Sequence, residues 1–188
     1  MGAQRLRSHL VATALVLLAV APAGAELRIS DLDVFLNDHE VTVHVVLLGA
    51  LPEGFQEGVQ SGIPTHVRLV VELWQYLRFL PDRLLVTKTV ERTLAYNVVT
   101  KEFKVAAVAG EAPRTYATRD LRDAQRVLSE IRSVKMTPAS SLDPAAVIYV
   151  RVNAVSALNG ENTFVTRMAG TAEQTTRQSD YRTIQRVQ

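Results

Sequence analysis

The chain has 188 residues, of which 47% are hydrophobic, and it contains no cysteine. The lack of cysteine excludes a disulfide framework, a thiolate nucleophile and a lipid-modified cysteine. Lys and Arg number 21 against 19 Asp and Glu, so the chain lacks the excess of basic residues that a nucleic-acid-binding surface needs. We therefore expect no nucleic-acid partner.

The first 25 residues have the order of a secretory signal peptide. Arg5 and Arg7 precede an apolar run from Leu10 to Ala21, and small residues follow up to Ala25. This order predicts cleavage after Ala25 and a periplasmic or secreted protein. The apolar run is about half as long as the roughly 20 residues of a spanning helix, so no stable membrane insertion is expected after cleavage. A leader that is kept as an anchor is the alternative.

Removal of the leader leaves about 163 residues, which is enough for one domain. We predict this domain at residues 26–168 and a polar, disordered tail at 169–188, because the tail has few large apolar residues to bury. Residues 26–112 hold 8 basic and 12 acidic residues, and residues 113–188 hold 11 and 7. This asymmetry indicates two solvated surfaces that attract each other within one fold, or an acidic partner for the second half.

Most of the predicted domain alternates apolar and polar residues with the period of a β-strand. The runs are VTVHVVLL (41–48), THVRLVVELWQY (65–76) and the segments 84–96, 102–108 and 145–155. Short connections favour antiparallel neighbours. Five or more strands need two buried faces, so we expect a mainly β protein with a single antiparallel β-sandwich, immunoglobulin-like or C2-like.

The apolar residues of three runs share one face of each run. They are Val41, Val43, Val45 and Leu47; Val67, Leu69, Val71 and Leu73; and Ala146, Ile148, Val150, Val152 and Ala154. Trp74 and Tyr76 lie on the opposite face of the second run. Rigid aromatic residues opposite the core are typical of binding hot spots, so Trp74 and Tyr76 are candidate partner-binding residues. The alternative is that a helix or a second sheet covers them.

Two segments have helical patterns. Residues 118–132 predict an amphipathic helix with Thr118 as its N-cap and with Arg126 and Glu130 paired on its outer face. Its apolar stripe consists of Leu121, Ala124, Leu128 and Ile131. Residues 52–61 predict a short helix, which is weak because Gly54 and Gly58 each cost about 1 kcal/mol relative to alanine.

The run HEVTVH (39–44) invites comparison with the His-Glu-x-x-His zinc signature, which needs two histidines four apart on a helix. His39 and His44 are five apart in a strand-like run, so they point to opposite faces and cannot share a metal. The chain also has no glycine-rich phosphate loop and no G-x-S-x-G motif. We expect no metal, no cofactor, no catalytic residues and no enzymatic activity.

The order of GIPTHVRLVVELW, a Pro-Asp turn, TLAYNVVTKEFKV, an amphipathic helix and LDPAAVIYVRVNAVSAL resembles the bacterial DUF4390 family of exported proteins. The resemblance covers about Leu27 to Leu158. Its most specific part is the pattern of Leu94, Tyr96, Phe103 and Val105 around a short turn, and the polar end of the chain departs from it. The family carries no assigned catalytic residues. The resemblance implies an envelope partner, for which a two-component sensor kinase is a candidate.

Two functions from different classes remain. The first is an exported, non-catalytic protein-binding or adaptor domain. The second is a carrier of an apolar ligand held between the sheets, which is suggested only by the hydrophobic fraction of 47%. We expect the first.

Overall fold

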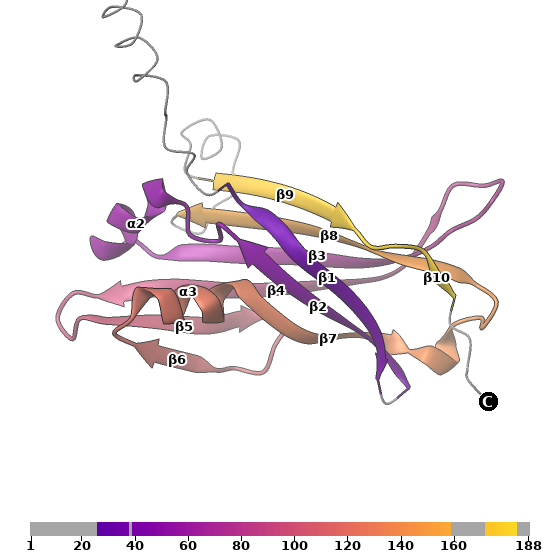
Figure 1. The fold of residues 1–188 in the computed structure, drawn as a ribbon. Coiled ribbons are helices and arrows are strands. Elements are labelled where there is room, and N and C mark those ends of the chain that lie inside the picture. Colours follow the sequence, from indigo (N-terminus) through magenta and orange to yellow (C-terminus); the bar gives the residue numbers. More distant parts are fainter. Residues whose placement is uncertain (1–25, 38, 159–171, 184–188) are drawn as a thin grey trace, which may run out of the picture.

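The computed structural model describes residues 26–37, 39–158 and 172–183. The predicted signal peptide lies outside these residues. The described chain forms two antiparallel β-sheets and two α-helices, which confirms the predicted mainly β sandwich (Figure 1). The elements are β1 (Arg28–Asn37), β2 (Glu40–Leu48), α2 (Glu53–Gln60), β3 (Thr65–Gln75), β4 (Arg83–Asn97), β5 (Glu102–Ala109), β6 (Thr115–Thr118), α3 (Leu121–Ser129), β7 (Glu130–Pro138), a 3₁₀ turn (Ala139–Ser141), β8 (Val147–Leu158), β9 (Ala172–Gln178) and β10 (Arg182–Thr183).

The two sheets differ in size. The small sheet has the order β1-β2-β7, and the large sheet has the order β10-β8-β3-β4-β5-β6, with β9 also paired to β8. Strands β3 to β6 form an antiparallel meander joined by short turns, as the short connections predict. The small sheet crosses in front of the large one in Figure 1, so each sheet has one face that the other covers.

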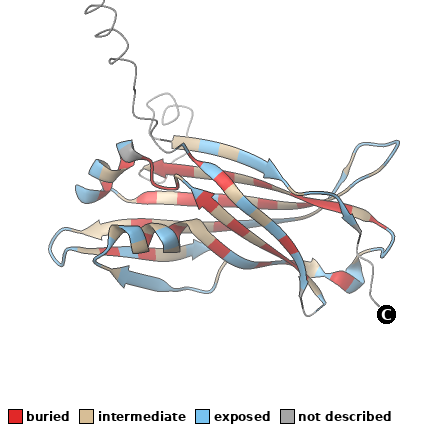
Figure 2. Ribbon diagram, in the orientation of Figure 1, coloured by how far each residue is buried: buried red, intermediate tan, exposed pale blue. Residues whose placement is uncertain are grey.

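The core lies between the sheets, on the faces that the sequence predicts. The apolar residues of all three predicted faces are buried, and the four on β3 are fully inaccessible. They belong to one continuous cluster that also includes residues of α2 and α3. Figure 2 shows buried and accessible residues alternating along the central strands. The period of two therefore locates the core of both sheets.

Strand β1 was not predicted, because its alternation is broken. A register shift between Ile29 and Asp31 changes which residues face the core. Ile29 and Val34 are buried, whereas Phe35 and Leu36 at the far end of the strand are exposed. A bulge of this kind removes the simple period of two from the sequence.

The predicted helix at 118–132 is shorter at both ends. Asp120 is the N-cap instead of Thr118, because its carboxylate accepts the backbone N–H of Arg122 at 2.8 Å. The helix ends at Ser129, and Ile131 lies in β7, where it pairs with Val45. The apolar stripe thus continues from helix into strand without leaving the core. The predicted helix at 52–61 is confirmed as α2, which follows Pro52.

The prediction of a disordered tail is wrong for residues 172–183, which contain β9 and β10. The predicted tail residues 169–171 and 184–188 lie outside the described chain. Strand β9 pairs with β8 along seven residue pairs, from Arg151–Gln178 to Ala157–Ala172. A polar strand can form here because its backbone groups gain partners at a sheet edge, which requires no apolar side chains. Composition alone does not reveal this stabilisation.

Candidate functional site

Four aromatic rings gather on the outer face of the large sheet, at the end where β3 leads into β4. Trp74 and Tyr149 are paired neighbours on β3 and β8, and their rings stack with centroids 6.4 Å apart and planes 7° apart. Tyr181 lies edge-on to both Tyr149 and Tyr76, with centroids 5.2 Å apart in each case. We call Trp74, Tyr76, Tyr149 and Tyr181 the aromatic platform.

The platform has a buried and an exposed part. Tyr149 is buried and Trp74 is half-buried, whereas Tyr76 and Tyr181 are 41% and 53% exposed. The Trp74 indole N–H donates to Glu72 at 2.9 Å, and the guanidinium of Arg151 lies 5.0 Å from the Trp74 ring centroid. Of the two predicted partner-binding residues, Trp74 supports the platform and Tyr76 presents its ring to solvent.

Sequence reasoning missed Tyr149 and Tyr181. Tyr149 joins Trp74 through the register between β3 and β8, which a single sequence does not show. Tyr181 follows the polar strand β9, in the segment that was predicted to be disordered. A tyrosine inside an otherwise polar segment was the one available signal, because isolated large aromatics usually find a packing partner.

Asp82 ties the β3–β4 connection to the platform. One of its carboxylate oxygens accepts the Tyr149 O–H at 2.8 Å, and the other accepts the backbone N–H of Leu77 at 3.1 Å. Burial, together with this hydrogen bond, raises the pKa of Tyr149 to about 12. A phenol with this pKa keeps its proton at neutral pH, so the Tyr149 O–H remains a donor to Asp82 and holds the loop in place.

A second feature is a pocket of about 410 Å³ between α3 and the β4–β6 end of the large sheet. Arg92 lines it and is largely buried. Its guanidinium forms a two-pronged ion pair with Glu111, at 2.6 and 2.7 Å, and donates to the carbonyls of Val127 and Glu130 where α3 ends. Because four of its five N–H groups are occupied, Arg92 acts as a cross-link between sheet and helix.

The outer rim of this pocket is an exposed polar cluster. Tyr116 and Arg126 both donate hydrogen bonds to Asp123, which lowers the pKa of that carboxyl. The same hydrogen bond raises the pKa of Tyr116. The two shifts move the pKa of the acid and the pKa of the phenol away from neutral pH in opposite directions.

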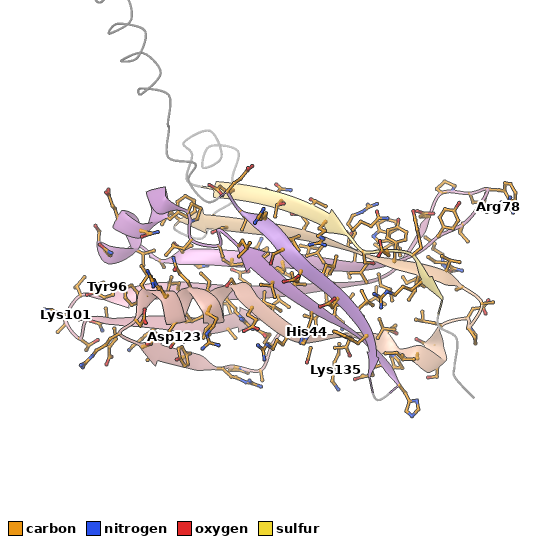
Figure 3. All side chains as sticks on the ribbon, viewed as in Figure 1. His44, Arg78, Tyr96, Lys101, Asp123 and Lys135 are labelled. Atoms are coloured by element: carbon orange, nitrogen blue, oxygen red, sulfur yellow. The ribbon has the colours of Figure 1, made fainter. Side chains whose placement is uncertain are left out.

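The two histidines of HEVTVH lie in different parts of the fold. His39 occupies the β1–β2 turn with φ +66°. His44 lies within β2 (Figure 3), and its ring is edge-on to Phe35 with centroids 5.6 Å apart. Across residues 26–37, 39–158 and 172–183, His, Cys, Asp and Glu form no group of three or more that could hold a metal ion. Within the same ranges, no helix is long and apolar enough to cross a bilayer.

Comparison with known proteins identifies a family. The model of the domain of unknown function DUF4390 matches residues 24–159, which include both sheets from β1 to β8 and both helices. No curated protein and no solved structure matches the chain significantly. Strands β9 and β10 lie beyond the matched segment. The family match covers most of the chain and agrees with the sequence pattern, and the chain therefore belongs to the DUF4390 family.

Proposed function

We propose that the protein is an exported, non-catalytic binding domain that docks another protein of the cell envelope on its aromatic platform. The observation that carries this proposal is the pair Tyr76 and Tyr181, which present two rigid, adjacent rings to solvent. Tyrosines in this setting offer a large contact area at a low cost in side-chain entropy. The buried Tyr149, which stacks on the half-buried Trp74, supports the exposed ring of Tyr181.

The charged neighbours of the platform favour a protein partner. Arg151 and Glu72 flank the Trp74 ring, so charged groups surround an aromatic centre. This arrangement is typical of protein interfaces, in which an apolar centre is surrounded by a polar rim. The resemblance to the family makes an envelope sensor kinase a first candidate partner.

An apolar ligand between the sheets has less support. The inner faces of the two sheets pack directly against one another in a continuous cluster of buried side chains. The pocket beside α3 is lined by several arginines and by Glu111 and Glu130, which suits an apolar ligand poorly.

Site-specific photocrosslinking in living cells tests the proposal. A photoreactive phenylalanine analogue replaces Tyr76 or Tyr181 in separate variants, and Val99 in a control. Val99 is highly exposed and belongs to the β4–β5 turn, which is distant from the platform. We expect one protein to be crosslinked at both platform positions and not at position 99. Absence of this product, or an equal product at position 99, would contradict the proposal.

A further inference from the structure

The β3–β4 connection is the most exposed apolar segment of the described chain. Phe79 and Leu80 are 88% and 68% exposed, although they are adjacent and both large. In Figure 1 the connection projects beyond the sheets, and Figure 3 places Arg78 at the extreme end of the molecule. We call residues 78–83 the hairpin tip. Large exposed apolar side chains that adjoin one another are frequent at interaction sites.

The hairpin tip is held in a defined conformation. Asp82 accepts hydrogen bonds from Leu77 N–H and from the Tyr149 O–H, and the backbone N–H of Tyr76 donates to Val147 O at 2.8 Å. Pro81 further restricts the turn. The exposure of Phe79 and Leu80 therefore results from an anchored backbone and not from the lack of a fixed structure.

The charges that the hairpin tip presents outward are positive. Asp82 is the only acid between residues 76 and 84, and its two oxygens are engaged by the molecule itself. Arg78 and Arg83 are exposed, and the Arg78 guanidinium lies 5.3 Å from the Phe79 ring centroid. The hairpin tip thus presents two apolar side chains and two cations to solvent, and no carboxylate of the tip points outward.

We propose that the hairpin tip inserts reversibly into the surface of a bilayer that contains anionic phospholipids. The order of groups along this end of the molecule matches the layers of such a surface. Phe79 and Leu80 would reach the boundary between headgroups and acyl chains, Arg78 and Arg83 would lie among the lipid phosphates, and the platform tyrosines would lie at the water side. A convex, projecting tip suits a soft, flat surface better than it suits a protein groove.

This proposal does not depend on a protein partner, because it uses other residues than Tyr76 and Tyr181. It does not require a membrane-spanning helix, since insertion of two side chains gives only peripheral binding. Arginines near an anionic surface add an electrostatic attraction that falls with salt. The membrane would then orient the aromatic platform close to the bilayer surface.

The absence of cysteine makes a depth measurement simple. In the variant Leu80→Cys, the single cysteine carries an environment-sensitive fluorophore. Val99→Cys is the control, because Val99 is 85% exposed in the β4–β5 turn. This turn also contains Lys101, which lies at the opposite end of the molecule in Figure 3. We expect the probe at position 80 to shift to shorter wavelength and to brighten with vesicles of phosphatidylglycerol and phosphatidylcholine. Vesicles of phosphatidylcholine alone should have little effect, and the probe at position 99 should not respond to either. An equal response at both positions, or none at position 80, would overturn the proposal.

Co-sedimentation with the same vesicles gives a second test. Phe79→Ser/Leu80→Ser should weaken binding by more than about 10-fold, and Arg78→Gln and Arg83→Gln by about 5-fold each. The matched control is Val98→Ser/Val99→Ser, which removes two residues that are 58% and 85% exposed and should leave binding unchanged. Circular dichroism verifies that all variants remain folded. If the tip variants bind vesicles like the wild type, the proposal fails, and crosslinking from position 79 to a protein would identify a protein site instead. Retained crosslinking at positions 76 and 181 would show that the proposed protein-binding function survives that failure.

Discussion

The two sheets meet along two sides of the molecule, which we call the helix seam and the C-terminal seam. Arginine side chains link the sheets on both sides, but in different ways. At the helix seam, where α3 and β7 lie against β4 and β5, Arg92 is largely buried and binds a carboxylate and two carbonyls. At the C-terminal seam, where β1 lies beside β9, the exposed Arg177 of β9 and Arg182 of β10 donate to carbonyls of β1. The helix seam is part of the core. The C-terminal seam is a surface contact formed by β9 and β10, and we call these two strands and their connection the C-terminal strap.

This difference separates global from local stability. Removal of a group that links the cores of two elements raises the free energy of the whole folded state, whereas removal of a surface strap frees one segment. The C-terminal strap also includes Tyr181, which contacts Tyr76 and Tyr149 in the aromatic platform. The helix seam therefore serves the fold, and the C-terminal seam serves the candidate binding surface.

The largest effect is expected where the helix seam meets the core. Leu128 of α3 is completely buried, so Leu128→Ala should lower the free energy of unfolding by about 3 kcal/mol through lost burial and an unfilled cavity. Chemical denaturation followed by circular dichroism measures this change. Sheet and helix should unfold in one transition, and a separate transition for the helix would show that the seam is not part of the core.

Substitution of Arg92 tests the polar part of the helix seam. Arg92→Met keeps the length of the side chain but leaves the partly buried Glu111 carboxylate and two carbonyls without their donor. We expect a loss of about 2 kcal/mol in the free energy of unfolding. The double variant Arg92→Met/Glu111→Gln should cost less than the sum of the single variants, and strict additivity would mean that the pair does not interact.

Most of this helix seam could be predicted from the sequence, and little of the C-terminal seam could. The apolar stripe of Leu121, Ala124 and Leu128 identifies the inner face of α3, because helical spacing is a local property. The pairing of Arg92 with Glu111 requires the β4–β5 register, and the positive φ of Gly110 brings Glu111 back toward β4. These features depend on tertiary structure, so no local pattern records them.

The candidate site was also only partly predictable from the sequence. Period two predicts that Trp74 and Tyr76 lie opposite the core. In the structure Trp74 lies in β3, and Tyr76 directly follows the end of that strand with its side chain exposed. Their partners Tyr149, in β8, and Tyr181, between β9 and β10, lie 75 or more residues further along the chain, and the strand that leads to Tyr181 is stabilised by backbone pairing at a sheet edge. A single sequence reveals which residues share a face, but not which strands lie side by side.

Alkaline pH tests the link between the platform and the hairpin tip. The pKa of Tyr149 is about 12 in the folded chain against 10.0 for an ordinary tyrosine, so the folded state favours the protonated phenol. Its contribution is fully present below pH 10 and is lost as the pH rises from 10 to 12. The stability difference between the wild type and Tyr149→Phe should therefore shrink by about 1 to 2 kcal/mol over this interval. Urea denaturation of both proteins at several pH values measures it, and a constant difference would show that the phenol is not shielded in solution.

A smaller and local effect is expected at the C-terminal seam. Arg177→Met removes the hydrogen bonds that the exposed Arg177 guanidinium donates to the carbonyls of Ile29 and Ser30. We expect a cost of about 1 kcal/mol, which appears as about 5-fold faster hydrogen exchange in β9. Exchange in the central strand β3 should stay unchanged, and a parallel acceleration there would show that the strap belongs to the core.

The smallest effect is expected for Arg126, which is the matched control for Arg92 because it is also an arginine at the helix seam with acidic partners. Arg126 lies 2.7 Å from Asp123 and 3.9 Å from Glu130, but its side chain is mostly exposed. Surface ion pairs of this kind gain little, since water and salt screen the charges and the long side chain loses freedom. Arg126→Ala should therefore change Tm by less than about 2 °C, and even that change should disappear at 1 M salt. Thermal denaturation of Arg92→Met and Arg126→Ala under the same conditions compares their effects on Tm. If both lower Tm equally, burial does not distinguish the two arginines, and the helix seam is held by surface charge instead of by the cross-link to Glu111 and the helix end.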